Sequence, residues 1–168
     1  MTFLVGALVN PTIHALDFPD ILLRLAAAAF CGLVIGFERQ WHQRAAGVQT
    51  TGLVATGAAL FCVAPLALHT TMGDPMRVVA AVVQGIGFLA GGVILKEGMN
   101  VRGLNTAATV WATAAIGALA GVGLVREAGV GALSIVILNF SFVPVARAID
   151  RRLERFVEKH KTPEEPIS

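Results

Sequence analysis

The fold class is decided by one stretch of the sequence, Gly85-Ile-Gly-Phe-Leu-Ala-Gly-Gly-Val-Ile-Leu-Lys-Glu-Gly-Met-Asn-Val-Arg-Gly-Leu-Asn-Thr-Ala-Ala-Thr-Val-Trp111. It joins a glycine-dense apolar segment, a short charged loop and a second apolar segment. Glycine inside a helix costs about 1 kcal/mol relative to alanine in water, whereas in lipid small residues let neighbouring helices approach closely. The stretch therefore predicts two tightly packed membrane helices joined at a polar end.

The composition of the whole chain also indicates a membrane protein. Of its 168 residues, 55% are hydrophobic and 14% are charged, against roughly 25% charged in an average globular protein. The basic residues lie in short loops and in the tail rather than on one face, so no nucleic-acid partner is expected. Cys31 and Cys62 fall inside apolar segments at no metal-like spacing. We expect two buried thiols, no metal site and no cofactor.

Five segments are long and apolar enough, or nearly so, to cross a bilayer, which requires about 20 residues. They comprise residues 21–37, 48–68, 78–95, 104–124 and 129–146. Residues 1–20 lack the basic start of a signal peptide and are expected to form a periplasmic or interfacial lead. The expected fold is an all-α membrane domain over residues 21–146, with five transmembrane helices in one glycine-rich bundle.

The basic residues predict the orientation of this bundle. Loops 38–46 and 96–103 carry two each and the tail from Arg147 carries six, whereas the opposite side carries three. Positive residues are retained in the cytoplasm during membrane insertion. We therefore expect the N-terminus outside and the C-terminus inside.

The tail is expected to continue as a cytoplasmic amphipathic helix over residues 147–161. Its apolar residues follow helical spacing on one stripe: Ile149, Leu153, Phe156 and Val157. Such a helix can lie on the anionic inner leaflet, dock under the bundle or pair with another copy. Residues 162–168 are rich in proline and glutamate and are expected to be disordered.

Small and polar residues form three helical faces that we interpret as packing seams, within one chain or between two. The seam residues are Gly32 and Gly36 in the first span, Gln84, Gly87 and Gly91 in the third, and Thr109, Thr113, Gly117 and Gly121 in the fourth. The alternative is that these faces line a narrow polar path. No acidic residue lies in the middle of a span, and Gln84 cannot carry charge, so a proton relay is not expected.

Charged and polar residues also gather at the predicted cytoplasmic ends of the first four spans. They are candidates for contact with a partner or for the mouth of an ion pathway: Glu38, Arg39, Gln49, Thr50, Lys96, Glu97, Asn100, Arg102, Asn105 and Thr106. Glu38 and Glu97 could approach one another around a divalent ion. We favour instead interfacial charges whose basic neighbours reach water, with Asn105 and Thr106 capping the fourth helix.

Three ordered blocks resemble the MgtC/SapB family of bacterial inner-membrane proteins, and most closely its MgtC branch. The blocks are Ile35-Gly-Phe-Glu-Arg-Gln-Trp-His-Gln-Arg-Ala-Ala-Gly-Val-Gln-Thr50, Leu53-Val-Ala-Thr-Gly-Ala-Ala-Leu-Phe61 and the stretch 85–111. The resemblance covers roughly residues 24–124 and implies a multi-pass protein of the inner membrane. One departure is Gln49, where the family usually has arginine.

The resemblance implies a non-enzymatic regulatory protein that supports adaptation to low magnesium and, in pathogens, survival in the host. Family members are associated with modulation of membrane complexes such as the rotary ATP synthase. The alternative function is a transporter or channel for magnesium or another small ion. An enzyme is not expected, because the sequence has no HExxH, no GxSxG and no close His/Asp/Ser grouping. A homodimer is expected, since three seams exceed what one small bundle needs.

Overall fold

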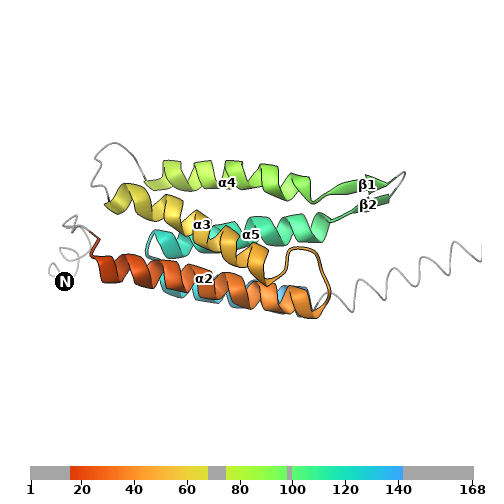
Figure 1. Cartoon of the computed structure of the whole chain (residues 1–168), viewed down its shortest axis with the longest axis horizontal. Coiled ribbons are helices and arrows are strands. Elements are labelled where there is room, and N and C mark those ends of the chain that lie inside the picture. The colour runs from red at the N-terminus through yellow and green to blue at the C-terminus, as the bar shows by residue number, and fades with distance from the viewer. Residues whose placement is uncertain (1–15, 68–74, 98–99, 142–168) are drawn as a thin grey trace, which may run out of the picture.

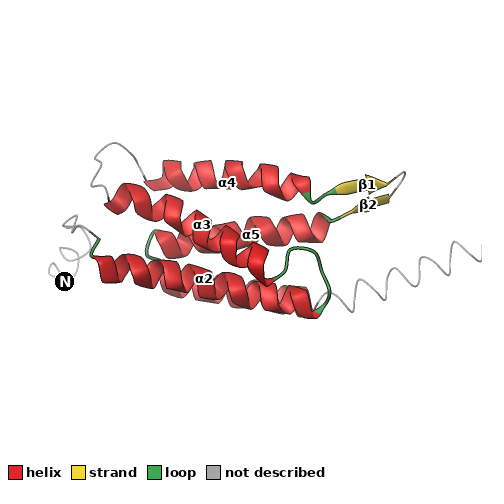
Figure 2. Cartoon of the chain, viewed as in Figure 1, coloured by secondary structure: helices red, strands yellow, loops and turns green. Residues whose placement is uncertain are grey.

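The computed structural model describes residues 16–67, 75–97 and 100–141. Within them, antiparallel helices form a bundle with a short hairpin at one end, as Figures 1 and 2 show. The labelled helices are α2 (Phe18–Trp41), α3 (Val48–Ala67), α4 (Pro75–Gly92) and α5 (Leu104–Gly121). A further helix, called the final helix here, covers residues 125–141 of the described chain. The predicted all-α membrane fold is confirmed.

Three of the described helices, α2, α3 and α5, are long and apolar enough to cross a membrane. The apolar part of α4, Met76–Gly92, is slightly shorter. Large apolar side chains on the outside of the bundle are exposed, among them Phe30, Phe61, Phe88 and Leu133. Exposed apolar side chains on this scale are typical of a helix bundle that lies in a membrane.

The helix boundaries differ from the predicted spans by a few residues. The first helix begins at Phe18, inside the predicted lead, with Asp17 as its N-cap and a proline in its first turn, a position that proline favours. The final helix begins at residue 125 rather than 129. The predicted amphipathic helix 147–161, the tail 162–168 and most of the lead lie outside the described residues.

The charged loop predicted after the third span is in fact a two-stranded hairpin. Strand β1 (Leu95–Glu97) pairs antiparallel with β2 (Asn100–Arg102), and Leu95 lies opposite Arg102. Gly103 then turns the chain into α5 with a φ of 88°, a left-handed conformation that glycine adopts most readily. A side chain at Gly103 would also collide with the carbonyl oxygen of Val93.

The core of the bundle is built mostly from small side chains. Its buried members are Ala28, Cys31, Ile35, Ala59, Ile116, Ala120, Ala128 and Ala132. Both cysteines are buried and free, as the sequence predicted. Small core residues bring the helix backbones close together, so the packing depends on the absence of side-chain volume rather than on large apolar groups.

Two of the three predicted seam faces lie against α3. A methyl group added at Gly32 of α2 would lie 2.6 Å from the carbonyl oxygen of Thr51, and one at Gly36 would collide with the Thr51 hydroxyl. On α5, a methyl group at Gly121 would lie 2.7 Å from the carbonyl oxygen of Ala59. The same face of α5 buries Thr109, Thr113 and Gly117. Helix α3 therefore packs closely against both α2 and α5.

The third predicted seam, on α4, is not covered by any described part of the same chain. Gln84 is exposed, and added methyl groups at Gly87 and Gly91 would meet no other atom within 4 Å. At the end of the bundle opposite the hairpin, Arg24 of α2 donates a hydrogen bond from Nη1 to the carbonyl oxygen of Gly121 at 3.0 Å. This bond satisfies one of the free carbonyls at the end of α5.

Candidate functional site

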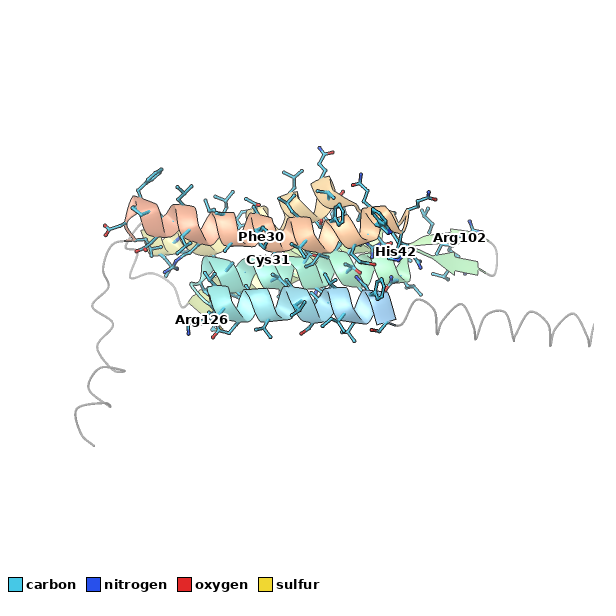
Figure 3. The ribbon with its side chains drawn as sticks, turned by 90° about the horizontal axis from the view of Figure 1, so that it is seen from below. Phe30, Cys31, His42, Arg102 and Arg126 are labelled. Atoms are coloured by element: carbon cyan, nitrogen blue, oxygen red, sulfur yellow. The ribbon has the colours of Figure 1, made fainter. Side chains whose placement is uncertain are left out.

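Most of the candidate residues lie at one end of the bundle, which we call the charged end. Figure 1 shows that the loop 42–47 after α2, the hairpin and the start of α5 lie together there. Figure 3 shows His42 and Arg102 at the charged end and Arg126 at the opposite end. The chain therefore brings together residues from segments far apart in the sequence, as we predicted for the cytoplasmic side.

Arg39 lies at the centre of the charged end and is only 1% exposed. Its Nη1 donates to Thr109 Oγ1 at 2.9 Å, and its Nη2 donates to Thr106 Oγ1 at 2.7 Å. On the loop side, Nε donates to the carbonyl oxygen of Ala46 at 3.1 Å, and Nη2 donates to that of Ala45 at 2.8 Å. One guanidinium group thus connects α2, the loop 42–47 and α5.

The acceptors around Arg39 are neutral. In the described part of the chain, no carboxylate forms an ion pair with its guanidinium. A buried charge is tolerated only when its hydrogen-bonding groups are satisfied, and hydrogen bonds from a charged donor are roughly twice as strong as neutral ones. The two hydroxyls and two carbonyls therefore take the place that a carboxylate occupies in an ordinary buried ion pair.

The prediction that the basic residue beside Glu38 reaches water is wrong for Arg39. The loop 42–47 folds back over the end of α2, because Gln43 and Ala46 adopt left-handed φ angles of 52° and 57°. The backbone N–H of Arg44 also donates to the carbonyl oxygen of Arg39 at 3.0 Å. The loop therefore covers the guanidinium and turns two of its carbonyl groups toward it. These backbone carbonyls accept the hydrogen bonds that water would otherwise accept.

Glu38 points away from Arg39 toward the final helix. Its carboxylate accepts a hydrogen bond from Asn139 Nδ2 at 3.3 Å and lies 3.2 Å from His42 Nδ1. The same His42 nitrogen is 2.9 Å from the Glu38 carbonyl oxygen, and the imidazole ring meets Phe140 edge-on at 6.1 Å between centroids. Glu38 and His42 therefore attach the end of α2 to the final helix.

The predicted capping of α5 by Asn105 and Thr106 is wrong. The N-cap residue is Gly103, which has no side chain to accept a capping bond. The Thr106 hydroxyl is engaged by Arg39 instead. The Asn105 side chain is exposed, and the backbone carbonyl oxygen of Asn105 accepts a hydrogen bond from the Thr109 hydroxyl at 2.8 Å. The N-cap lies two to three residues before these polar residues, so their side chains face the bundle or solvent.

The remaining candidate residues do not join this network. Gln49, Thr50, Lys96 and Arg102 are exposed, and the side chains of Glu97 and Asn100 lie outside what the structure describes. A meeting of Glu38 with the second acid of the proposed metal pair is therefore untested. Among the described residues, no group of three or more His, Cys, Asp or Glu side chains is placed to hold a metal ion.

Sequence reasoning missed three contributors to the charged end. His42 follows Glu38 by four residues, a spacing that places both on one helical face. Asn139 was visible as an amide within an apolar segment. Thr109 was assigned to a packing seam although it is one turn from Thr106 on the same face. The loop carbonyls carry no sequence signal, since every residue has one.

Residues 25–148 match the family model of the MgtC family. The chain belongs to the MgtC family. Protein MgtC of Salmonella typhimurium is 48% identical over 136 residues, which cover 81% of this chain and 58% of that protein. Protein MgtC of Brucella abortus is 48% identical over 126 residues, covering 75% and 52%. An uncharacterized protein of Synechocystis, slr0014, is 47% identical over 137 residues, covering 82% and 58%.

The chain spans a little over half the length of these curated MgtC relatives. No solved structure matches it. The MgtC match begins at Leu25 and includes every described residue of the charged end. The Arg39 network therefore lies within the part of the chain that is shared with the family.

Proposed function

We propose that this MgtC-family protein is a non-enzymatic regulator that binds another complex of the bacterial inner membrane, such as the rotary ATP synthase. In doing so it supports adaptation to low magnesium and, in a pathogen, survival in the host. The membrane bundle positions the charged end on the cytoplasmic side, where it contacts the partner. The observation that carries this proposal is the engagement of Arg39 by groups of its own chain.

The buried polar groups favour a fixed scaffold over an ion pathway. Arg39 is the one charged side chain in the buried core of the described residues, and its donors meet two hydroxyls and two carbonyls. Within the same residues, no buried side-chain nitrogen or oxygen lacks a hydrogen-bond partner. An ion path needs polar groups that exchange their partners for the ion, and groups held within the bundle are poorly suited to this.

The exposed residues around Arg39 favour an acidic partner surface. Arg44 and Lys96 are exposed at the charged end, and Trp41 at the end of α2 is 76% exposed. Arginine and aromatic residues are enriched at protein interfaces, and complementary charge steers association. The partner is therefore expected to present carboxylates near the membrane surface.

We also propose a homodimer formed through the outer face of α4. Gln84 lies near the middle of α4, and its side chain is exposed on the surface of the single chain. An amide that faces hydrocarbon without a partner is unfavourable, and glycines beside a polar group are typical of helix contacts in membranes. A monomeric mass in mild detergent and also in nanodiscs would contradict this dimer.

Photocrosslinking in native membranes tests the partner. A photoreactive amino acid at position 44 is expected to yield an adduct with a subunit of another inner-membrane complex in cells grown in low magnesium. The matched control is position 30, an exposed site on α2 well away from the charged end (Figure 3). Equal adducts at both positions, or none at position 44, would count against a partner at the charged end.

Magnesium flux into proteoliposomes tests the alternative. The regulator is expected to carry no flux above protein-free vesicles in a folded, correctly oriented preparation. Flux that Glu38→Gln and Asn105→Ala abolish would replace the regulatory proposal with transport and place the ion mouth at the charged end.

A further inference from the structure

An apolar groove lies between α3 and α4, away from the charged-end network. It has a volume of about 520 Å³, and its floor includes Ala58 and Ala114. Exposed large side chains stand at its rim, namely Leu53, Phe61 and Leu89. Every side chain that lines the groove is apolar, so its occupant has to be apolar along this length.

Two glycines, one on each wall, keep the groove wide. They are Gly57 of α3 and Gly85 of α4, and an added methyl group at either one would meet no other atom within 4 Å. The glycines of α2 and α5 behave differently, since their faces are filled by neighbouring backbone. The glycines of the groove therefore mark open space rather than close helix packing.

The length of the groove fits one acyl chain of a lipid leaflet. On α4 its lining runs from Val78 to Leu89, which is about 16 Å at 1.5 Å per residue. This is about half of the hydrocarbon thickness of roughly 30 Å, or one leaflet.

A cation stands at the outer end of the groove. Arg77 lies in the first turn of α4, next to Val78, and is exposed. It precedes Ala81 and Gly85 by four and eight residues, so it shares a helical side with two residues of the groove wall. Side chains on a helix point toward its N-terminus, which directs the guanidinium toward the membrane surface. Among the described residues, no side chain forms an ion pair with Arg77, and arginine binds phosphate strongly.

We propose that this groove binds one acyl chain of an anionic phospholipid whose headgroup phosphate pairs with Arg77. The lipid belongs to the leaflet opposite the charged end, since α4 begins at the end away from the hairpin (Figure 1). A bound lipid there fills the space that keeps α4 apart from α3.

Native mass spectrometry of the full chain tests the site. Phosphatidylglycerol is titrated against phosphatidylcholine with the same acyl chains, and the first lipid adduct is quantified. The anionic lipid is expected to bind about fivefold more tightly, the effect of one cation near an anionic headgroup. Arg77→Gln is expected to abolish this preference. The control Arg126→Gln, which removes an exposed arginine at the same end of the bundle (Figure 3), is expected to keep it.

Filling the groove tests the acyl chain separately. Gly57→Leu combined with Gly85→Leu is expected to lower binding of both lipids at least tenfold while the protein stays folded, because neither site is crowded. The control Gly129→Leu changes an equally open glycine outside the groove. Equal binding of the two lipids, unchanged binding after filling, or the same loss in the controls would overturn the proposal. So would crosslinking of a cysteine at position 61 to a second copy with no lipid adduct, because a protein helix would then occupy the groove.

Discussion

Replacing Thr106 and Thr109 by valine tests the Arg39 network directly. Valine keeps nearly the same shape and removes only the hydroxyl that accepts from the guanidinium. A hydrogen bond to a charged group contributes about 1.5–3 kcal/mol to stability. Each single variant is therefore expected to lower the free energy of unfolding by about 1.5–3 kcal/mol, and the double variant by about 3–6 kcal/mol, because two N–H groups of a buried cation are left unsatisfied.

Removing the cation should rescue that double variant. Arg39→Met on its own leaves only neutral acceptors, and the exposed loop carbonyl of Ala45 can bind water instead. Its expected loss is about 1–3 kcal/mol, because losing both partners is less harmful than leaving one buried and unsatisfied. The triple variant, with methionine at 39 and valine at both threonine positions, is therefore expected to be about 2–3 kcal/mol more stable than the double valine variant.

Unfolding in mixed dodecylmaltoside and sodium dodecyl sulfate micelles, followed by circular dichroism, measures these free energies. Thr56→Val is the matched control, because the Thr56 hydroxyl bonds only to the Gly52 carbonyl of its own helix at 2.8 Å. Its expected change is below about 0.5 kcal/mol. The reasoning is refuted if the double valine variant is no less stable than the Thr56→Val control. It is also refuted if adding Arg39→Met to the double valine variant lowers the stability of that variant further.

Three further predictions use the same unfolding measurement. Gly117→Ala is expected to lower the free energy of unfolding by about 1–3 kcal/mol, since its methyl group would collide with the backbone of α3. The control Gly57→Ala, at an open site, should instead raise it by up to about 1 kcal/mol. Equal effects of the two changes would show that α5 does not pack as described. Gly103→Ala is expected to lose at least about 1–2 kcal/mol through its left-handed φ, and a neutral result would mean that the turn into α5 is formed differently. Arg24→Gln should lose about 1 kcal/mol with the bond to the Gly121 carbonyl, and an unchanged stability would show that this bond contributes nothing.

The helices could be predicted because a run of apolar residues long enough to cross a bilayer has few alternatives to a helix. The burial of Arg39 could not be predicted in this way. Its sequence neighbours look like an ordinary interfacial helix end, and its acceptors Thr106 and Thr109 lie 67 and 70 residues further along the chain. Whether an arginine at a helix end reaches water depends on what folds over it, and here a loop with two left-handed residues does so.

Glycine spacing likewise predicts that a face is small but not what lies against it. Gly36 of α2, Gly121 of α5 and Gly87 of α4 all follow helical spacing on narrow faces. Methyl groups added at the first two would collide with α3, whereas one added at the third would meet no other part of the described chain within 4 Å. The hairpin was missed for another reason, since strands of three residues are too short for an alternating pattern to be recognised.

The two arginines of α2 have a consequence for the order in which the protein is assembled. Arg39 and Arg24 bind α5 near its two ends, but α2 leaves the ribosome well before α5 has been synthesised. Until α5 enters the bilayer, both guanidinium groups lack these acceptors and stay in water at opposite membrane surfaces. We therefore expect α2 to complete its contacts only after α5 has been synthesised, so that a late helix fixes the position of an early one.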